Sequence, residues 1–113
     1  MKLIIAIIQP DRLNEVLDAL EENDIHLVTV TNVMGRGRQR GEAQIYRGHK
    51  EVGSLLRKVK LEIAINDEYV EKTQQAIIEN SRTGNIGDGK IFVVELADVV
   101  RIRTGESGND AIG

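Results

Sequence analysis

The sequence predicts an α+β domain of the ferredoxin-like βαββαβ type, because two kinds of apolar pattern follow one another in a recognisable order. Helix-spaced apolar residues occur over residues 10–22 and 67–81, and strand-like patterns occur over residues 3–8, 25–33, 59–65 and 90–96. Strand, helix, strand, strand, helix and strand is the order of the split βαβ unit. A chain of 113 residues can build one hydrophobic core, so we expect a single domain over residues 1–113.

The first strand and the first helix have the clearest patterns. Leu3–Ile8 is apolar at every position, as in a central strand that is covered on both faces. Pro10 suits the first turn of a helix, and Asp11 suits the positive end of the helix dipole. The helix over residues 10–22 then has one apolar stripe, made by Leu13, Val16, Leu17 and Leu20.

Alternating residues predict the second and third strands. From residue 25, one face of an extended chain carries Ile25, Leu27, Thr29, Thr31 and Val33, and the other carries His26, Val28, Val30 and Asn32. Val59–Ile65 alternates between apolar and polar residues in the same way. Two helices can cover one face of such a sheet. We therefore expect a neighbouring subunit to cover the other face, on which we place Val28, Val30 and Ala64.

The second helix and the last strand complete the domain. Asp67 is placed to cap this helix, with Glu68 in its first turn. Its inner face is expected to contain Val70, Thr73, Ile77 and the pair Asn80 and Ser81. A glycine-rich loop then ends the helix and leads into the strand Lys90–Leu96.

Composition limits the classes of function. The chain has no cysteine, which excludes disulfides and thiolate chemistry, and its longest apolar run, Leu3–Ile8, is far too short to span a membrane. Fifteen basic and eighteen acidic residues give a net charge of −3, which argues against broad nucleic-acid binding. We expect a soluble, cytoplasmic protein.

Between the second and third strands, residues 35–56 follow neither period. They contain five glycines and several basic residues, among them Arg36, Arg38 and Arg40. A long loop between two clear strands is usually functional. A nucleic-acid module that uses these arginines is one alternative, although the strands lack the aromatic residues on which bases would stack. Gly35–Gly41 opens no helix, so it is not a dinucleotide-binding fingerprint.

The stretch from Thr83 to Lys90 is the strongest candidate for a binding site. Gly87 and Gly89 flank Asp88, so the backbone there can take positive φ angles and carries few side chains. Successive exposed N–H groups attract anions and Lys90 adds a positive charge, so phosphate is the expected ligand. The alternative is an ordinary glycine-rich turn. The stretch is not a P-loop, because a P-loop leads from a strand into a helix.

Other charged residues could take part in anion binding. Lys58, Lys60 and Glu62 share one face of the third strand, which is either a solvated surface or a cleft wall where Lys58 meets a carboxylate or phosphate. Arg101 and Arg103 would point to the same side of an extended segment and could grip phosphate oxygens. The alternative is that both are ordinary surface arginines.

No pattern for metal binding or nucleophilic catalysis is apparent. His26 and His49 have no carboxylate or second histidine at ligand spacing, so both are expected to be surface residues. No Ser or Thr occurs with a His and an acid in a recognisable order. Nothing in these residues suggests a catalytic triad.

Several motifs together resemble the PII nitrogen-regulatory signal proteins. Thr83–Leu96 looks like the C-terminal signature of that family, and Arg101–Glu106 with Asp110–Ile112 is similar to its tail. Further segments resemble its long loop and its third strand: Gly35–Gly41, Tyr46–Gly48 and Lys58–Glu62. The resemblance covers essentially the whole chain.

The resemblance implies a compact homotrimer with three nucleotide sites at the clefts between subunits. The residues that match the phosphate-binding loop for ATP or ADP are Gly87, Asp88, Gly89 and Lys90. Those that would reach the phosphates from the neighbouring subunit are Arg101 and Arg103, with Ile102 between them. Positions around the adenine and ribose are matched by Thr29, Glu62 and Ala64. The base of the long flexible loop, about residues 37–56, is matched by Gly37, Arg38 and Gln39.

The resemblance also implies a second ligand and a partner. Gln39 would ligate Mg²⁺ together with ATP and 2-oxoglutarate, and Lys58 would pair with a 2-oxoglutarate carboxylate. Arg47, beside Tyr46 in the loop, matches the residue that family members insert into an ammonium channel. ATP and ADP would hold the loop in different arrangements, which is a population shift.

Some positions depart from the family pattern. This chain has Glu51 where many members carry a uridylylated tyrosine, and His49 where others carry a phosphorylated serine, so we predict no covalent modification there. The unusual Gly48–Glu51 run leaves open another transporter or a metabolic enzyme as the target, without 2-oxoglutarate sensing. A small acyl-phosphate hydrolase is a further alternative. Its anion loop, however, follows the first strand, where this chain has Gln9–Asp11.

Overall fold

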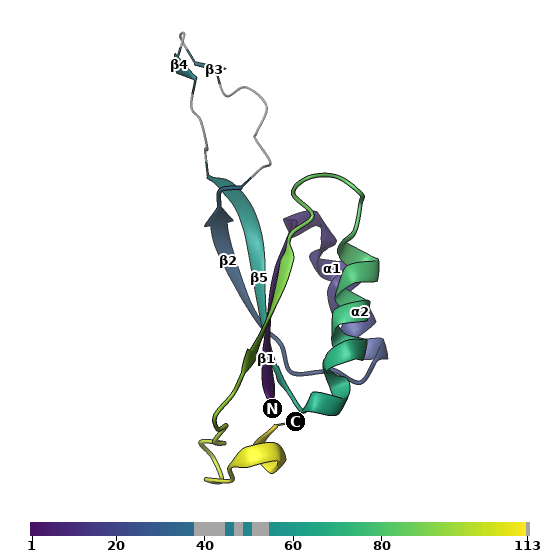
Figure 1. Ribbon diagram of the computed structural model, residues 1–113, viewed down its shortest axis with the longest axis vertical. Helices are drawn as coiled ribbons and strands as arrows, with labels where there is room; N and C mark the ends of the chain where they lie inside the picture. The colour runs from purple at the N-terminus through teal and green to yellow at the C-terminus, as the bar shows by residue number, and fades with distance from the viewer. Residues whose placement is uncertain (38–44, 47–48, 51–54, 113) are drawn as a thin grey trace.

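The structure, a computed structural model, describes residues 1–37, 45–46, 49–50 and 55–112. Its main sheet has four antiparallel strands in the order β2-β5-β1-β6. These strands are β1 (Lys2–Ile8), β2 (Thr29–Gly35), β5 (Leu56–Ile65) and β6 (Lys90–Glu95). In the described part of the chain, two α-helices lie on one face of this sheet, α1 (Leu13–Glu22) and α2 (Val70–Ser81) (Figure 1). The predicted ferredoxin-like α+β fold is confirmed.

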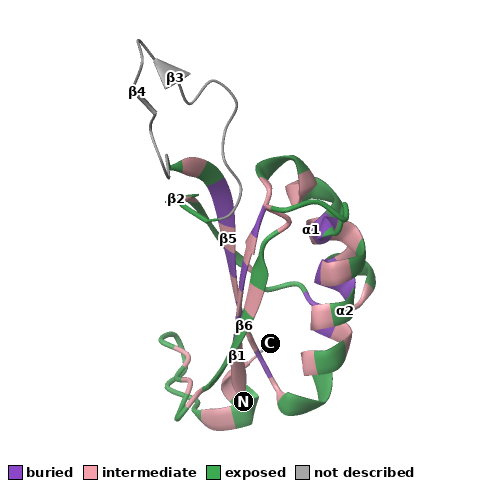
Figure 2. Ribbon diagram, turned by 45° about the horizontal axis from the view of Figure 1, so that its top comes forward, coloured by how far each residue is buried: buried purple, intermediate pink, exposed green. Residues whose placement is uncertain are grey.

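The hydrophobic core lies between the sheet and the two helices. Short 3₁₀ turns, Pro10–Arg12 and Asp67–Tyr69, precede α1 and α2, so the first helical segment begins at Pro10 as predicted. The strands contribute Ile4, Ala6, Ile8, Leu61 and Ile63 to the core, and the helices contribute Val16, Leu20, Ala76 and Ile77. Figure 2 shows buried residues on β1, β5 and the helices, whereas β6 is mostly exposed. The core is aliphatic, as the composition requires.

The second strand begins later than predicted. β2 starts at Thr29 and not at Ile25, because Asp24 has a positive φ of 63° and turns the chain there. The N–H of Ile25 donates to the carbonyl of Leu20 at 2.9 Å, so Ile25 closes the end of α1. Ile25 is buried, and its apolar character reflects this contact and not a strand.

The prediction that Val28 and Val30 lie on the open face of the sheet is wrong. Val30 pairs with Leu61, which is fully buried under the helices, so both side chains lie on the helix-covered face. Val28 also packs against the core. Ala64 pairs with Leu3 and lies on the open face as predicted. The β2 residues on that open face are Thr29, Thr31 and Val33.

The prediction that Asp67 caps the second helix is wrong. Its carboxylate accepts a hydrogen bond from the terminal ammonium group of Met1 at 2.8 Å and pairs with Lys2 at 3.2 Å. Both contacts hold the pKa of Asp67 below its ordinary value, and the contact with the terminal ammonium group has the larger effect. Asn66 occupies the cap position and makes no side-chain cap hydrogen bond. Asp67 therefore anchors the start of the chain and not the start of the helix.

The face of the sheet away from the helices is apolar at one edge. Phe92 and Val94 of β6 are 49% and 45% exposed, and they pair with Ile5 and Leu3 on that face. β6 is also an edge strand, with backbone groups on one side that pair with no strand of the main sheet. An exposed apolar face of this kind usually marks an interaction surface.

Between β2 and β5, the described residues form a short ladder that the pattern did not predict. β3 (Ile45–Tyr46) and β4 (His49–Lys50) pair in antiparallel fashion. The rest of the predicted long loop, residues 38–44, 47–48 and 51–54, lies outside the described residues. Elsewhere in the described chain, no helix is long and apolar enough to cross a membrane.

Candidate functional site

The candidate binding residues lie at two opposite ends of the sheet. Lys90, at the start of β6, pairs near the end of β1, whereas Glu95, at the end of β6, pairs with its start. The glycine-rich loop before Lys90 is thus at one end, and the tail that carries Arg101 and Arg103 is at the other (Figure 1). One chain does not bring these two regions together.

Asp88 holds the loop Thr83–Lys90 in shape. Its carboxylate accepts hydrogen bonds from the backbone N–H groups of Thr83 and Gly84 at 2.8 and 2.9 Å, and from the Thr83 hydroxyl at 2.5 Å. These hydrogen bonds, led by that of the Thr83 side chain, hold the pKa of Asp88 below its ordinary value. The acid between the two glycines therefore folds the loop back on itself.

Glycines take positive φ angles at three positions of this loop, and that of Gly84 is 89°. Gly87 and Gly89 have φ angles of 103° and 108°, which residues with a Cβ rarely adopt. A Cβ at Gly89 would lie 1.8 Å from the carbonyl oxygen of Ile7. The loop backbone therefore runs directly against the end of β1, and no larger residue can replace Gly89 without moving one of the two strands.

The loop presents unpaired backbone donors. The N–H groups of Gly87, Asp88 and Gly89 donate to none of the residues that the structure describes. Successive free N–H groups in such a turn form a concavity that favours an anion. The loop thus has backbone donors without a partner among the described residues, and their binding of an anion stays a prediction.

Two side chains, one from β5 and one from the residue after β1, donate to the carbonyl of Gly87. Lys58 Nζ donates to this oxygen at 3.2 Å, and Gln9 Nε2 donates at 2.8 Å. Lys58 is only 9% exposed, and burial lowers the pKa of its ammonium group, although the charge of Asp88 acts in the opposite direction. An ammonium group held away from water in this way gains from a ligand carboxylate or phosphate. Gln9 was not predicted, because it follows a strand and belongs to no periodic pattern.

A cavity of about 550 Å³ lies beside the loop on the open face of the sheet. It is lined by Lys58, by the loop backbone from Asn85 to Lys90, by Phe92 and by Gly35–Gly37. Its volume lies within the range of about 300–1,000 Å³ that is typical of small-molecule sites. The structure thus brings together a set that we call the loop-end group: Gly37, Lys58, Gly87, Asp88, Gly89 and Lys90.

The tail forms a turn and not an extended segment. The Arg101 carbonyl accepts a hydrogen bond from the N–H of Gly105 at 2.7 Å, and the Arg101 guanidinium pairs with Glu106 at 2.8 Å. The expectation that Arg101 and Arg103 share one side of an extended chain is therefore wrong. Ile102, between them, is fully exposed.

The remaining predicted residues lie nearer the tail than the loop. Thr29 pairs with Glu62 across β2 and β5, and Thr29 and Ala64 line a cavity of about 350 Å³ with Val99 and Ile112. We call the following set the tail-end group: Thr29, Glu62, Ala64, Arg101, Ile102 and Arg103. Each chain thus carries two separate groups of candidate residues at its two ends.

Some predicted residues are not placed. Arg38, Gln39 and Arg47 lie outside the described residues, and Tyr46 is described only as part of β3. In the described ranges, no group of three or more His, Cys, Asp or Glu residues could hold a metal ion.

His26 is a surface residue, 54% exposed, as predicted, but it does have a carboxylate partner. Its Nδ1 lies 2.8 Å from Glu21 Oε2, and this contact raises the pKa of His26. The sequence spacing missed this pair because Glu21 is in α1 and His26 follows the turn after that helix.

Together, these observations define a ferredoxin-like α+β domain with a glycine-rich loop and a cavity beside an open sheet face. The chain matches the family model of nitrogen regulatory protein P-II over residues 1–106. It is 54% identical over 112 residues to nitrogen regulatory protein P-II 1 of Methanothermobacter thermautotrophicus, covering 99% of this chain and 97% of that protein.

Two bacterial relatives are similarly close. Nitrogen regulatory protein P-II of Bradyrhizobium diazoefficiens and that of Azospirillum brasilense are each 52% identical, over 99% of this chain and 100% of each relative. The chain therefore belongs to the P-II family of nitrogen regulatory proteins. This membership places it among signal transducers of nitrogen regulation.

Proposed function

We propose that this chain is a non-catalytic sensor of ATP and ADP, and of 2-oxoglutarate, that regulates nitrogen assimilation by binding target proteins. The targets include an ammonium channel, which the segment between β2 and β5 would contact with Tyr46 and Arg47. The single observation that carries the proposal is the loop-end group. There, free backbone N–H groups and two lysines border one cavity.

The nucleotide phosphates are proposed to bind at the loop-end group. The N–H groups of Gly87, Asp88 and Gly89 supply short-range donors, and the ammonium group of Lys90 supplies charge. Mg²⁺, when bound with ATP, would neutralise part of the phosphate charge, and Gln39 is its proposed ligand. Because the glycine backbone is already held by Asp88 and Gln9, little ordering is needed on binding.

The tail-end group of a neighbouring chain is proposed to complete each site in a homotrimer. One chain keeps the two groups at opposite ends of the sheet and leaves the sheet face at Phe92 exposed. A neighbour packed on this face could place Thr29, Glu62 and Ala64 against the adenine and ribose. Its Arg101 and Arg103 would then add charge at the phosphates.

Lys58 is the proposed partner of 2-oxoglutarate. A ligand carboxylate would replace the Gly87 carbonyl as the acceptor for Lys58 and relieve the burial of its ammonium group. The ligands would shift the segment between β2 and β5 from one arrangement to another only if they bind the two arrangements with different affinities. A second candidate is a nucleotide sensor without 2-oxoglutarate, because Lys58 already has an acceptor in Gly87.

The proposal is tested by mixing two defective variants. Lys90→Ala alters the loop-end group and Arg103→Ala alters the tail-end group. Each should weaken ATP binding by about 1–3 kcal/mol, the value of a hydrogen bond to a charged group. If sites form between chains, about one quarter of all sites should be intact in trimers refolded from an equal mixture. An intact site needs its loop-end group from an Arg103→Ala chain and its tail-end group from a Lys90→Ala chain. Calorimetry with ATP measures this fraction.

Two outcomes would reject the proposal. A mixture that regains no high-affinity sites would show that the two groups do not meet between chains. A purified chain that is monomeric and does not bind ATP or ADP would remove the sensor function altogether. Titrations with and without Mg²⁺ and 2-oxoglutarate separate the first candidate from the second.

A further inference from the structure

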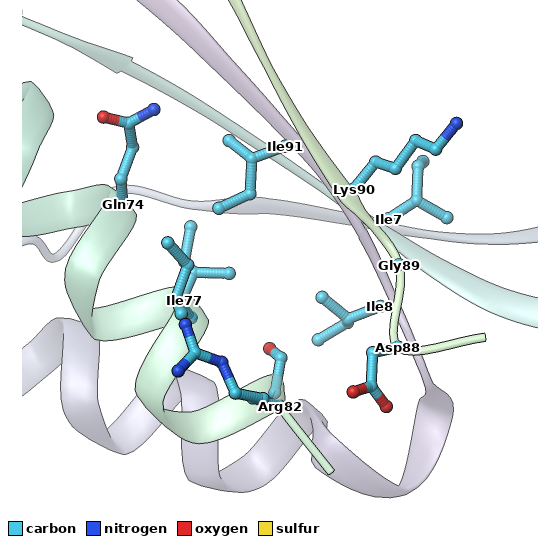
Figure 3. Close-up of a pocket in the computed structure, with 11 residues that line it drawn as sticks. Ile7, Ile8, Gln74, Ile77, Arg82, Asp88, Gly89, Lys90 and Ile91 are labelled. Atoms are coloured by element: carbon cyan, nitrogen blue, oxygen red, sulfur yellow. The ribbon is translucent and has the colours of Figure 1, made fainter. Parts of the chain in front are cut away.

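A second cavity, of about 340 Å³, lies on the other side of the glycine-rich loop. It is bounded by the last turns of α2, the end of β1 and the start of β6 (Figure 3). Asp88, Gly89 and Lys90 form a wall that this cavity shares with the larger one. In Figure 3 the side chain of Lys90 extends away from the cavity, so Lys90 serves the opposite side of the loop.

The floor of this cavity is apolar. Ile8 and Ile77 are each 1% exposed and belong to the core, and Ile91 packs against the same cluster. Figure 3 shows these three side chains around the cavity, from β1, α2 and β6. A ligand that fits here must bring apolar surface to isoleucine side chains.

One buried polar group at the wall lacks a partner. Ser81 is 6% exposed, and its hydroxyl oxygen has no hydrogen-bond partner among the described residues. Buried hydroxyl groups are almost always hydrogen-bonded, because burying one without a partner is unfavourable. Ser81 lines the cavity, but its hydroxyl oxygen has less than 1 Å² of exposed surface, so rotation of the side chain is needed before a ligand there can supply the missing partner.

A cation stands at the rim. Arg82 lines the cavity, and its guanidinium makes no hydrogen bond or ion pair with any residue in the described part of the chain (Figure 3). Asp88 lines the same cavity, but its carboxylate oxygens already accept hydrogen bonds from Thr83 and Gly84. The rim therefore offers an available positive charge next to an apolar floor.

We propose that this cavity binds a small monocarboxylate with a short or branched aliphatic chain. The carboxylate would accept hydrogen bonds from the Arg82 guanidinium and the Ser81 hydroxyl, and the aliphatic chain would pack on Ile8, Ile77 and Ile91. The volume is near the lower end of the range of about 300–1,000 Å³ that is typical of small-molecule sites, which favours a small ligand. Because Asp88 and Gly89 border both cavities, such a ligand would contact the loop from its reverse side. The proposal does not depend on nucleotide binding.

The test uses 3-methylbutanoate and its neutral analogue 3-methylbutanamide with the full chain in its native assembly. A ligand of this size should bind with a Kd of about 1 mM, measured from backbone amide shifts, and the neutral amide should bind much more weakly. The amides of Ser81, Arg82 and Ile91 should show the largest shifts.

Two variants identify the groups involved. Arg82→Gln should weaken 3-methylbutanoate binding about tenfold or more, since a charge-assisted hydrogen bond is lost. Ser81→Ala should weaken it about fivefold, yet leave the melting temperature unchanged or raised, because its hydroxyl has no partner in the folded chain. Lys72→Gln removes a cation from the same helix but lies over the Tyr69 ring, outside the cavity, and should bind normally.

Three results would overturn the proposal. One is the absence of any shift with 3-methylbutanoate at about twenty times the expected Kd. Another is binding that survives Arg82→Gln but is lost in Lys58→Gln, which would place the carboxylate in the larger cavity. The third is a structure of the assembly in which a neighbouring chain fills the space between Ile77 and Ile91.

Discussion

The loop end and the tail end of the sheet are organised by opposite means. At the loop end, the Asp88 carboxylate accepts hydrogen bonds from Thr83, and the side chains of Lys58 and Gln9 donate to the Gly87 carbonyl. At the tail end, Arg101 is paired with Glu106 inside an exposed turn, and the next residue is fully exposed. The loop end is held by contacts to the core of the same chain, and the tail end mainly by contacts with itself.

This difference determines how much conformational freedom each end of the sheet loses when a ligand binds. A loop whose backbone is already fixed loses little conformational freedom when an anion binds. The exposed Arg103 of the tail, by contrast, must be ordered by whatever covers it, and long side chains lose the most freedom on ordering. This contrast is consistent with a site in which the loop supplies geometry and a second chain supplies charge.

The largest expected effect is that of Gly89→Ala at the loop end. The new Cβ would meet the Ile7 carbonyl and require a positive φ, so we expect a loss of about 3 kcal/mol or more in the free energy of unfolding. Gly84→Ala is the matched control, because its φ is also positive but a Cβ there meets nothing, which leaves about 1 kcal/mol of strain. Denaturation at fixed protein concentration compares them, and equal losses would contradict the close approach.

A smaller effect is expected from titrating Asp88. Since hydrogen bonds lower the pKa of this carboxyl in the folded chain, their contribution is complete above the ordinary value of 3.8 and is lost as pH falls through the lower folded value. Carboxyl carbon shifts followed by NMR should therefore show Asp88 titrating below 3.8, with Asp88→Asn as the control. A carboxyl that titrates at or above its ordinary value would contradict the described loop.

At the tail end, Glu106→Gln should have little effect on stability. Arg101 and Glu106 are 29% and 45% exposed, and pairs this accessible contribute less than about 1 kcal/mol. The variant should still shift the side-chain resonances of Arg101, which loses its ion pair with Glu106 but keeps its hydrogen bond to the Asp110 carbonyl. A loss as large as that of Gly89→Ala would show that the tail is as firmly built as the loop.

The smallest effect is expected at His26, which lines the cavity of about 350 Å³ together with Thr29 and Ala64. Contact with Glu21 raises the pKa of His26 above 6.5, so its contribution is complete below 6.5 and is lost as pH rises through the folded value. His26→Gln should therefore lower the melting temperature slightly at pH about 5.5 and not at pH about 8.5. The reverse pH dependence would contradict the pairing, and Glu21→Gln should reproduce the effect.

Local patterns predicted the helices and strands, but not the partners of the polar residues at their ends. The apolar stripe of α1 and the alternation of β5 located the core, because burial on one face imposes a period on the sequence. Asp67 looked like a cap, yet it pairs with the chain terminus, which lies 66 residues away. Such a partner has no local signature, so the error at Asp67 could not be avoided from the sequence.

The candidate site divides in the same way. The glycines around Asp88 were recognisable because their backbone role is local. The sequence did not predict the contact of Gln9 with Gly87, or that Ser81 and Arg82 line a cavity with residues of β1 and β6, because these partners belong to other segments of the chain.

By itself, the sequence determined the order of strands and helices, the helix-covered core and the glycine-rich loop, and its motifs carried the family resemblance. Only the tertiary structure decided that Lys58 and Gln9 share one carbonyl oxygen and that Arg101 lies at the far end of the sheet from Lys90. The physical reason is that periodicity records which side of an element is buried. The position of one element relative to another depends on pairing and packing across the whole chain.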